Sequence, residues 1–192
     1  MTSIRLPAAR ILRYLAALTL MGVLTNSLPL QVHAEDPAPK FSKPVIDIGV
    51  VVSDLEKSAR FYTNVIGFKE VSGFTVSPEM GKKIGLTDSL GVKIRVFELG
   101  EGNLATKIKL MAFPQSGGTK PDRHFIHSTI GLNYLTIYVS DMTQSLQRLK
   151  ASEVKLLGES PVELGGGTLL VTFQDPDGTF IELIGPAKAA GN

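Results

Sequence analysis

Several apolar segments of the chain carry charged or hydroxyl-bearing side chains at positions where a fully buried strand would hold only apolar ones. Because successive side chains of a strand point to opposite faces, each of these groups shares a face with its neighbours two residues away. Carboxylates, phenols and an ammonium group on such faces can bind a small polar molecule or transfer a proton. The residues concerned are Asp47, Lys109, Tyr134, Tyr138 and Glu182.

Chemistry that depends on a thiolate is excluded, because the chain contains no cysteine. A further candidate is the pair His124 and His127, the only histidines after residue 34. Two histidines three residues apart can bind a metal on a helix, but their polar surroundings and the nearby Pro121 favour a surface loop. A role in which Arg123 and the two histidines contact an anionic ligand stays open.

The patterning of the chain indicates which strands and helices position these residues. A β-prone run precedes Ser53 and Glu56, whose spacing is that of a capping box at the start of a helix. Apolar residues then recur at helical intervals until Gly67, which is expected to end the helix. The expected elements are a strand at 45–52, a helix from 53 to 66, and strands at 70–76, 92–99 and 107–113.

The same plan repeats after a polar, glycine-rich segment at 114–131. The run Val52-Ser53-Asp54-Leu55 recurs as Val139-Ser140-Asp141-Met142, at an offset of 87 residues. Because the surrounding order of elements also matches, a tandem repeat is the better interpretation. The second set comprises a strand at 132–139, a helix from 140 to about 151, and strands at 155–157, 162–164, 168–174 and 179–184, with a hairpin turn predicted at Gly165-Gly166-Gly167.

Two segments carry a resemblance to a known family. They are Ile48-Gly-Val-Val-Val-Ser-Asp-Leu-Glu-Lys-Ser58 and Phe173-Gln-Asp-Pro-Asp-Gly-Thr-Phe-Ile-Glu-Leu-Ile184. Both resemble the vicinal oxygen chelate superfamily, which contains glyoxalase I, extradiol dioxygenases and bleomycin-resistance proteins. The resemblance implies an α+β fold in which tandem βαβββ modules form a curled-sheet cup. It implies a single domain at 45–186, with module 1 at 45–113, an inter-module segment at 114–131, module 2 at 132–186 and a tail at 187–192.

Members of this superfamily hold a metal in the cup with residues from the first and last strands of each module. The resemblance places the four ligand positions at Asp47, Lys109, Tyr134 and Glu182. Divalent transition metals prefer imidazoles and carboxylates, whereas the ammonium group of lysine repels a cation. The set therefore resembles a degenerate metal site, so no cofactor is expected and a divalent metal is disfavoured.

Three interpretations of these residues are open. In the first, the cup binds a small organic molecule, with Lys109 as an internal cation between Asp47 and Glu182. In the second, the protein is a lyase or dioxygenase resembling glyoxalase, with Glu182 as the base and Lys109 or a weakly held metal as the electrophile. In the third, the charged residues are only a structural ion-pair cluster. The expected ligand-binding set is Asp47, Lys109, Tyr134, Tyr138, Glu182, His124 and His127.

Residues 1–34 have the order of a secretory signal peptide. Three arginines precede an apolar stretch at 14–24, and Val32-His33-Ala34 provides small residues for cleavage after Ala34. The apolar stretch is shorter than the ~20 residues of a membrane span. A retained anchor is therefore the second interpretation and a cytosolic amphipathic start the third. Three prolines at 35–44 indicate an extended lead-in to the domain.

Cleavage would change the charge of the protein. The whole chain has a net charge of +2, but residues 1–34 contain three of its 20 basic residues and none of its 18 acidic ones, so the remaining 158 residues carry −1. Without a basic surplus, nucleic acid is not expected as a partner. We expect a secreted or periplasmic protein without a stable membrane anchor, whose partner is a small-molecule ligand; a homodimer stays open.

Overall fold

A computed structural model of the chain describes residues 40–116 and 118–188. The chain divides into two units, residues 1–40 and residues 41–192, and the fold belongs to the second unit. The expected signal peptide, the first half of the lead-in (35–39) and the last four residues lie outside the described residues. Within the described ranges, no helix has both the length and the apolar character needed to cross a membrane.

The first half of the fold is a four-stranded mixed sheet with the strand order β1-β4-β3-β2. β1 runs parallel to β4, and the other neighbours are antiparallel. Its helix α1 continues directly into a π-helical segment, η1. The elements are β1 (Asp47–Val51), α1 (Leu55–Arg60), η1 (Phe61–Ile66), β2 (Lys69–Val76), α2 (Pro78–Lys83), β3 (Val92–Leu99), the 3₁₀ turn η2 (Gly102–Leu104) and β4 (Thr106–Met111).

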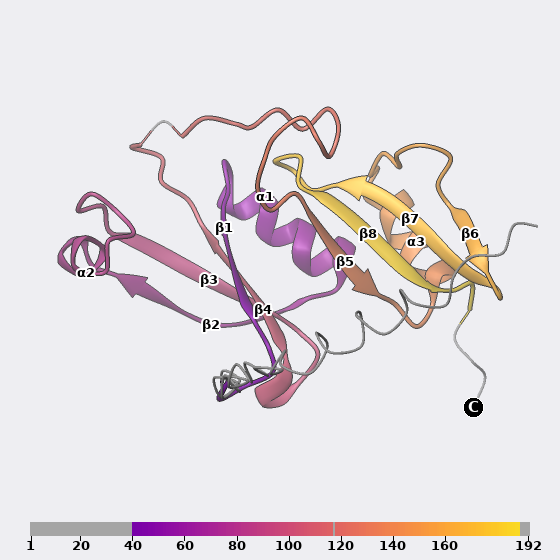
Figure 1. The fold of residues 1–192 in the computed structure, drawn as a ribbon, viewed down its shortest axis with the longest axis horizontal. Coiled ribbons are helices and arrows are strands. Elements are labelled where there is room, and N and C mark those ends of the chain that lie inside the picture. Colours follow the sequence, from indigo (N-terminus) through magenta and orange to yellow (C-terminus); the bar gives the residue numbers. More distant parts are fainter. Residues whose placement is uncertain (1–39, 117, 189–192) are drawn as a thin grey trace, which may run out of the picture. The chain divides into compact units, whose positions relative to one another are not determined.

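The second half repeats this topology with the strand order β5-β8-β7-β6, and β5 runs parallel to β8 (Figure 1). Its elements are β5 (Tyr134–Tyr138), α3 (Met142–Ala151), β6 (Val162–Gly165), β7 (Thr168–Gln174) and β8 (Phe180–Pro186). Two sheets with the same order, each with its helix between the first and second strands, confirm the predicted α+β fold of tandem βαβββ modules.

Local details differ from the sequence-based expectation at three places. The helix α1 is capped by Asp54, which accepts a hydrogen bond from the Lys57 amide, and not by Ser53. The short helix α2 was not expected, although Ser77 and Pro78 are typical of a helix start. The segment 155–157 forms only one isolated bridge, between Leu156 and Phe173.

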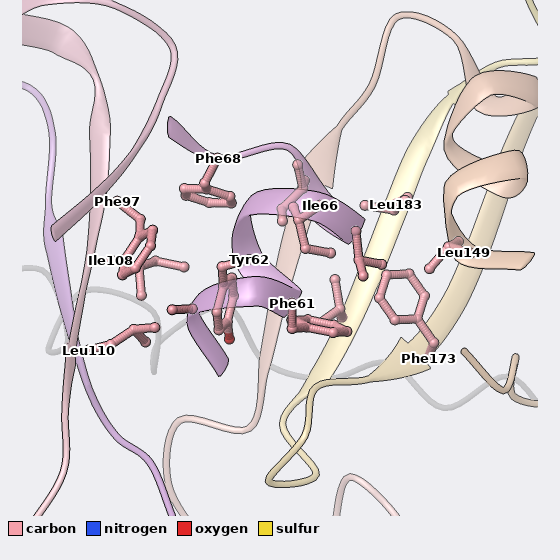
Figure 2. Close-up of a cluster of buried hydrophobic side chains, with 14 of the residues drawn as sticks. Phe61, Tyr62, Ile66, Phe68, Phe97, Ile108, Leu110, Leu149, Phe173 and Leu183 are labelled. Atoms are coloured by element: carbon pink, nitrogen blue, oxygen red, sulfur yellow. The ribbon is translucent and has the colours of Figure 1, made fainter. Parts of the chain in front are cut away.

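One hydrophobic core joins the two sheets. Figure 2 shows Phe61 and Tyr62 of η1 between strands that carry Phe97, Ile108 and Leu110 on one side and Phe173 and Leu183 on the other. The ring centroids of Phe61 and Phe173 lie 6.2 Å apart in an edge-to-face arrangement. Because each sheet turns one face to this core, its other face carries the side chains that alternate with the core residues.

Candidate functional site

The alternation of side chains determines the face on which each candidate residue lies. Ile108 and Leu110 of β4 are buried in the core, so Lys109 between them belongs to the opposite face. In the same way, Ile181 and Leu183 of β8 are buried and Glu182 lies on the other face. Both charged residues therefore occupy the sheet faces that turn away from the helices.

Lys109 forms an ion pair with Asp47 across β1 and β4. The Lys109 Nζ atom lies 2.8 Å from Asp47 Oδ2, and the side chains are 30% and 37% exposed respectively. The hydrogen bond from Lys109, together with the charges of Lys109, Lys107 and Lys43, holds the pKa of Asp47 below its usual range. Two residues before Lys109 on β4, Lys107 pairs with Glu98 at 2.8 Å. Hence Asp47 stays ionised at neutral pH and neutralises Lys109.

Glu182 has a different partner on the second sheet. The Thr136 hydroxyl donates a hydrogen bond of 2.8 Å to Glu182 Oε2, and the two residues are paired in the register of β5 and β8. Tyr134 and Tyr138 share this face of β5 and are 47% and 78% exposed. Sequence reasoning left Thr136 out of the candidate set, although its position two residues from each tyrosine placed it on the same face.

The two parts of the candidate set are thus built separately. Asp47 bonds to Lys109 on the first sheet, and Glu182 bonds to Thr136 on the second. Within residues 40–116 and 118–188, no ion pair connects Lys109 to Glu182. The first interpretation of the sequence placed Lys109 between Asp47 and Glu182. Among the described residues, Lys109 forms its ion pair with Asp47 alone.

His124 and His127 lie on a surface loop, as the sequence predicted. Both are exposed and flank the exposed ring of Phe125, with centroid distances of 4.4 Å to His124 and 5.5 Å to His127. The loop is held by Asn133, whose amide nitrogen donates to the carbonyls of Ile126 and Thr129. On the protein surface, His127 therefore stacks on the Phe125 ring, whereas His124 contacts that ring edge-to-face.

The Asp-Pro-Asp-Gly turn between β7 and β8 connects the two halves of the fold, a role that sequence reasoning missed. Asp175 is buried and accepts hydrogen bonds from the Tyr62 hydroxyl at 2.9 Å and from the amides of Asp177 and Thr179. Asp177 accepts from both the amide and the hydroxyl of Ser53, and pairs with Lys120 at 3.1 Å.

These contacts change the protonation behaviour of the groups in this turn. Burial, followed by the charge of Asp175, raises the pKa of Tyr62, so its hydroxyl remains a donor. Burial alone would raise the pKa of Asp177, but the hydrogen bonds from Ser53 and Lys120 outweigh it and lower the pKa. The Tyr62 hydroxyl therefore stays protonated and the Asp177 carboxylate stays ionised at neutral pH.

The donor set at the four positions suggested by the resemblance fits a divalent metal poorly. Lys109 would place an ammonium group among the ligands, and it already occupies an oxygen of Asp47. The remaining donors, Tyr134 and Glu182, lie on the other sheet. A carboxylate pair without the lysine would suit Mg²⁺ or Ca²⁺ better.

Tandem βαβββ modules with polar groups on the faces away from the helices define a glyoxalase-like protein. A match to the Glyoxalase/Bleomycin resistance protein/Dioxygenase superfamily extends over residues 45–183, so this chain belongs to that family. No curated protein matches the chain.

Several solved structures share this fold. A glyoxalase family protein from Bacillus cereus is 21% identical, with a TM-score of 0.64 and coverage of 81% of this chain and 99% of that one. A glyoxylase/bleomycin resistance protein/dioxygenase domain from Frankia sp. is 20% identical, with a TM-score of 0.52 and coverage of 80% and 95%. A glyoxalase I mutant from Zea mays is 22% identical, with a TM-score of 0.54 and coverage of 75% and 45%. At these identities the likeness concerns the fold alone.

Proposed function

We propose that this protein binds a small organic molecule on the polar faces of its sheets, and that it does so without a divalent metal. The observation that carries the proposal is the ion pair between Lys109 and Asp47, which places a neutralised cation where a metal-binding relative would need a ligand. A lysine that stays partly exposed can still donate to a carbonyl or carboxylate oxygen of a bound molecule.

The alternative, a purely structural ion pair, explains these residues less well. An ion pair whose two side chains are each about a third exposed contributes little to stability, because water and salt screen the attraction. On the second sheet, the face of β5 that carries Thr136 also carries Tyr134 and Tyr138, which are large exposed aromatic side chains. Aromatic rings next to a few polar groups are typical of small-molecule sites. We therefore favour a ligand over a packing role.

A thermal-shift screen tests this proposal. We expect small aromatic, keto or glutathione-like compounds to raise the melting temperature without added metal, because a ligand that binds the folded state stabilises it by mass action. The variant Lys109→Gln should lose the shift, and Lys155→Gln, which changes an exposed lysine elsewhere, should keep it. Elemental analysis of the purified protein that finds stoichiometric, tightly bound Fe, Zn, Ni or Mn would contradict the metal-free proposal.

A second candidate is catalysis, and the hydrogen bond between Thr136 and Glu182 favours it. This bond fixes the orientation of a half-buried carboxylate, which is what a general base needs. Lys109 would then stabilise developing negative charge on the substrate. In this case a compound from the screen should turn over, and Glu182→Gln should abolish turnover while leaving its binding within about threefold. Binding without any turnover selects the first proposal.

Export is the third part of the proposal, and the composition of residues 1–34 supports it. Mass spectrometry of the protein recovered from the periplasm or medium should give a chain that begins at Glu35. A variant without residues 2–34 should stay in the cytoplasm. Recovery of the full-length chain from the cytoplasm would overturn this part alone.

A further inference from the structure

We infer that a cavity beside Arg123 is a second small-molecule site, which takes a compact apolar molecule with a single carboxylate. The cavity has a volume of about 230 Å³ and is bounded by β1, by the start of β5 and by the turn between β7 and β8. Its walls are largely apolar, with Ile48, Val51, Leu132 and Leu135 among them. Arg123 provides the positive charge.

Arg123 is held in place from several sides. Its Nη1 donates to the side-chain oxygen of Asn133, and its backbone carbonyl accepts a hydrogen bond of 2.7 Å from the side-chain Nε2 of Gln174. Its aliphatic part lies against Gly178, where a Cβ atom would come within 2.9 Å of Arg123 Cβ and Cγ. The guanidinium group is therefore positioned before any ligand arrives, which lowers the entropy cost of binding.

The guanidinium group is also incompletely satisfied. Arg123 Nε is buried, and it has no acceptor among the described residues. A buried donor without an acceptor costs free energy, and most such groups in proteins have a partner. Arg123 also takes part in no ion pair among the described residues, so a carboxylate in the cavity would provide its guanidinium group with a charge-assisted partner.

The other charged residue of the cavity does not compete for Arg123. Asp177 lines the same cavity, but its carboxylate already accepts two hydrogen bonds from Ser53 and an ion pair from Lys120. Thr179, which also lines the cavity, adds a hydroxyl-bearing side chain. The cavity therefore retains one uncompensated cation in apolar surroundings.

Volume and polarity then select the ligand. Drug-sized molecules occupy pockets of roughly 300–1,000 Å³, so a cavity of about 230 Å³ admits only a smaller one. A second charge on the ligand would face walls that are largely apolar and would find no cationic partner besides Arg123 among the lining residues. A benzoate-sized monocarboxylate satisfies both requirements.

This site is separate from the one that contains Lys109. Neither Asp47 nor Lys109 lines the cavity, and Ile48, which does line it, points to the face of β1 opposite to Asp47. The inference goes beyond the function proposed above and does not depend on it.

Benzoate and its uncharged analogue benzamide provide the test. In the isotope-labelled full chain, we expect benzoate to shift the NMR amide signals of Gly49, Val51 and Thr179 saturably at neutral pH. Benzamide should bind at least tenfold more weakly, because it lacks the charge that Arg123 recognises. This comparison uses the wild-type protein, so it does not depend on how any variant folds. Equal affinities, or no saturable shift at these amides, would overturn the inference.

Three variants identify the group responsible. Arg123→Gln should weaken benzoate binding at least tenfold, and Arg60→Gln, the same change at an exposed arginine outside the cavity, should leave it unchanged. Lys109→Gln should also leave benzoate binding unchanged.

The same variants separate this inference from the first proposal. If Lys109→Gln removes benzoate binding and Arg123→Gln does not, the carboxylate binds on the sheet face. That result overturns this inference and supports the first proposal. If benzoate binding follows Arg123 but no compound responds to Lys109, only the first proposal fails.

Discussion

At the scale of single residues, polar groups placed in an apolar environment make specific contacts between the halves of the fold. Tyr62 belongs to the run Phe61–Ile66, whose apolar pattern predicts packing alone. Its ring does pack in the core, 5.9 Å from Phe68, but its hydroxyl also donates to the buried carboxylate of Asp175. One side chain thus contributes both apolar burial and a hydrogen bond that spans 113 positions in the sequence.

The variant Tyr62→Phe tests the energetic weight of this bond. The ring would keep its packing, but the buried Asp175 would lose one of its donors, so we expect a loss of about 1–3 kcal/mol in the free energy of unfolding. Urea denaturation measures this loss. Tyr138→Phe is the matched control, because Tyr138 is 78% exposed and its hydroxyl contacts solvent; it should change stability by less than ~0.5 kcal/mol. Similar small effects for both variants would show that the bond contributes nothing measurable.

At the scale of elements, patterns local in sequence predict strands and helices well, and contacts distant in sequence change the details. The alternation in Lys107–Met111 and the left-handed Gly67 (φ +100°) behave as their types predict. Ser53 does not cap the helix as its type and spacing predict. Its amide and hydroxyl donate to Asp177, 124 positions away, and Asp54 caps α1. No pattern in the first repeat reveals that partner.

The same holds for the candidate site. The sheet face on which each candidate residue lies could be predicted from the alternation of side chains. The pairing of Lys109 with Asp47, and not with Glu182, could not be predicted, because it depends on the contact between β1 and β4.

The pairing of β2 with β3 is irregular next to Gly73, where the two backbones approach each other closely. The pairing is interrupted between Val71 and Phe74, and a Cβ atom at Gly73 would clash with the Ile94 carbonyl. We expect Gly73→Ala to lower the free energy of unfolding by about 1–3 kcal/mol, because the backbone of β3 would have to move. Thermal denaturation measures the change.

The control for this variant is Gly49→Ala in β1 of the same sheet. A Cβ atom there would lie 3.5 Å from Met111 Cε, which is an ordinary contact. Alanine restricts the unfolded chain more than glycine does, so Gly49→Ala should be neutral or stabilising by up to ~1 kcal/mol. If Gly73→Ala is as well tolerated as Gly49→Ala, the interruption in β2 does not depend on glycine.

At the scale of the whole molecule, the two modules share one core and one set of polar contacts. A single hydrophobic cluster contains Phe97 and Ile108 of the first sheet together with Phe173 and Leu183 of the second. The turn between β7 and β8 adds the hydrogen bonds that Tyr62 donates to Asp175 and that Ser53 donates to Asp177. Because the same elements carry the core and border the cavity beside Arg123, loosening the contact between the modules should affect both stability and binding.

The pH dependence of stability isolates the contribution of Asp177. Its pKa is lowered in the folded protein, so its carboxylate stabilises the fold above the unfolded pKa of ~3.9 and loses that effect as the pH falls through the lower, folded value. At pH 7 we expect Asp177→Asn to lower the free energy of unfolding by about 1–3 kcal/mol, and the difference from wild type should shrink steadily below pH 4. Asp88→Asn, at an exposed acidic residue, should differ little from wild type throughout. A deficit for Asp177→Asn that stays constant down to pH 2 in urea titrations would mean that the shape of this side chain, and not its charge, holds the modules together.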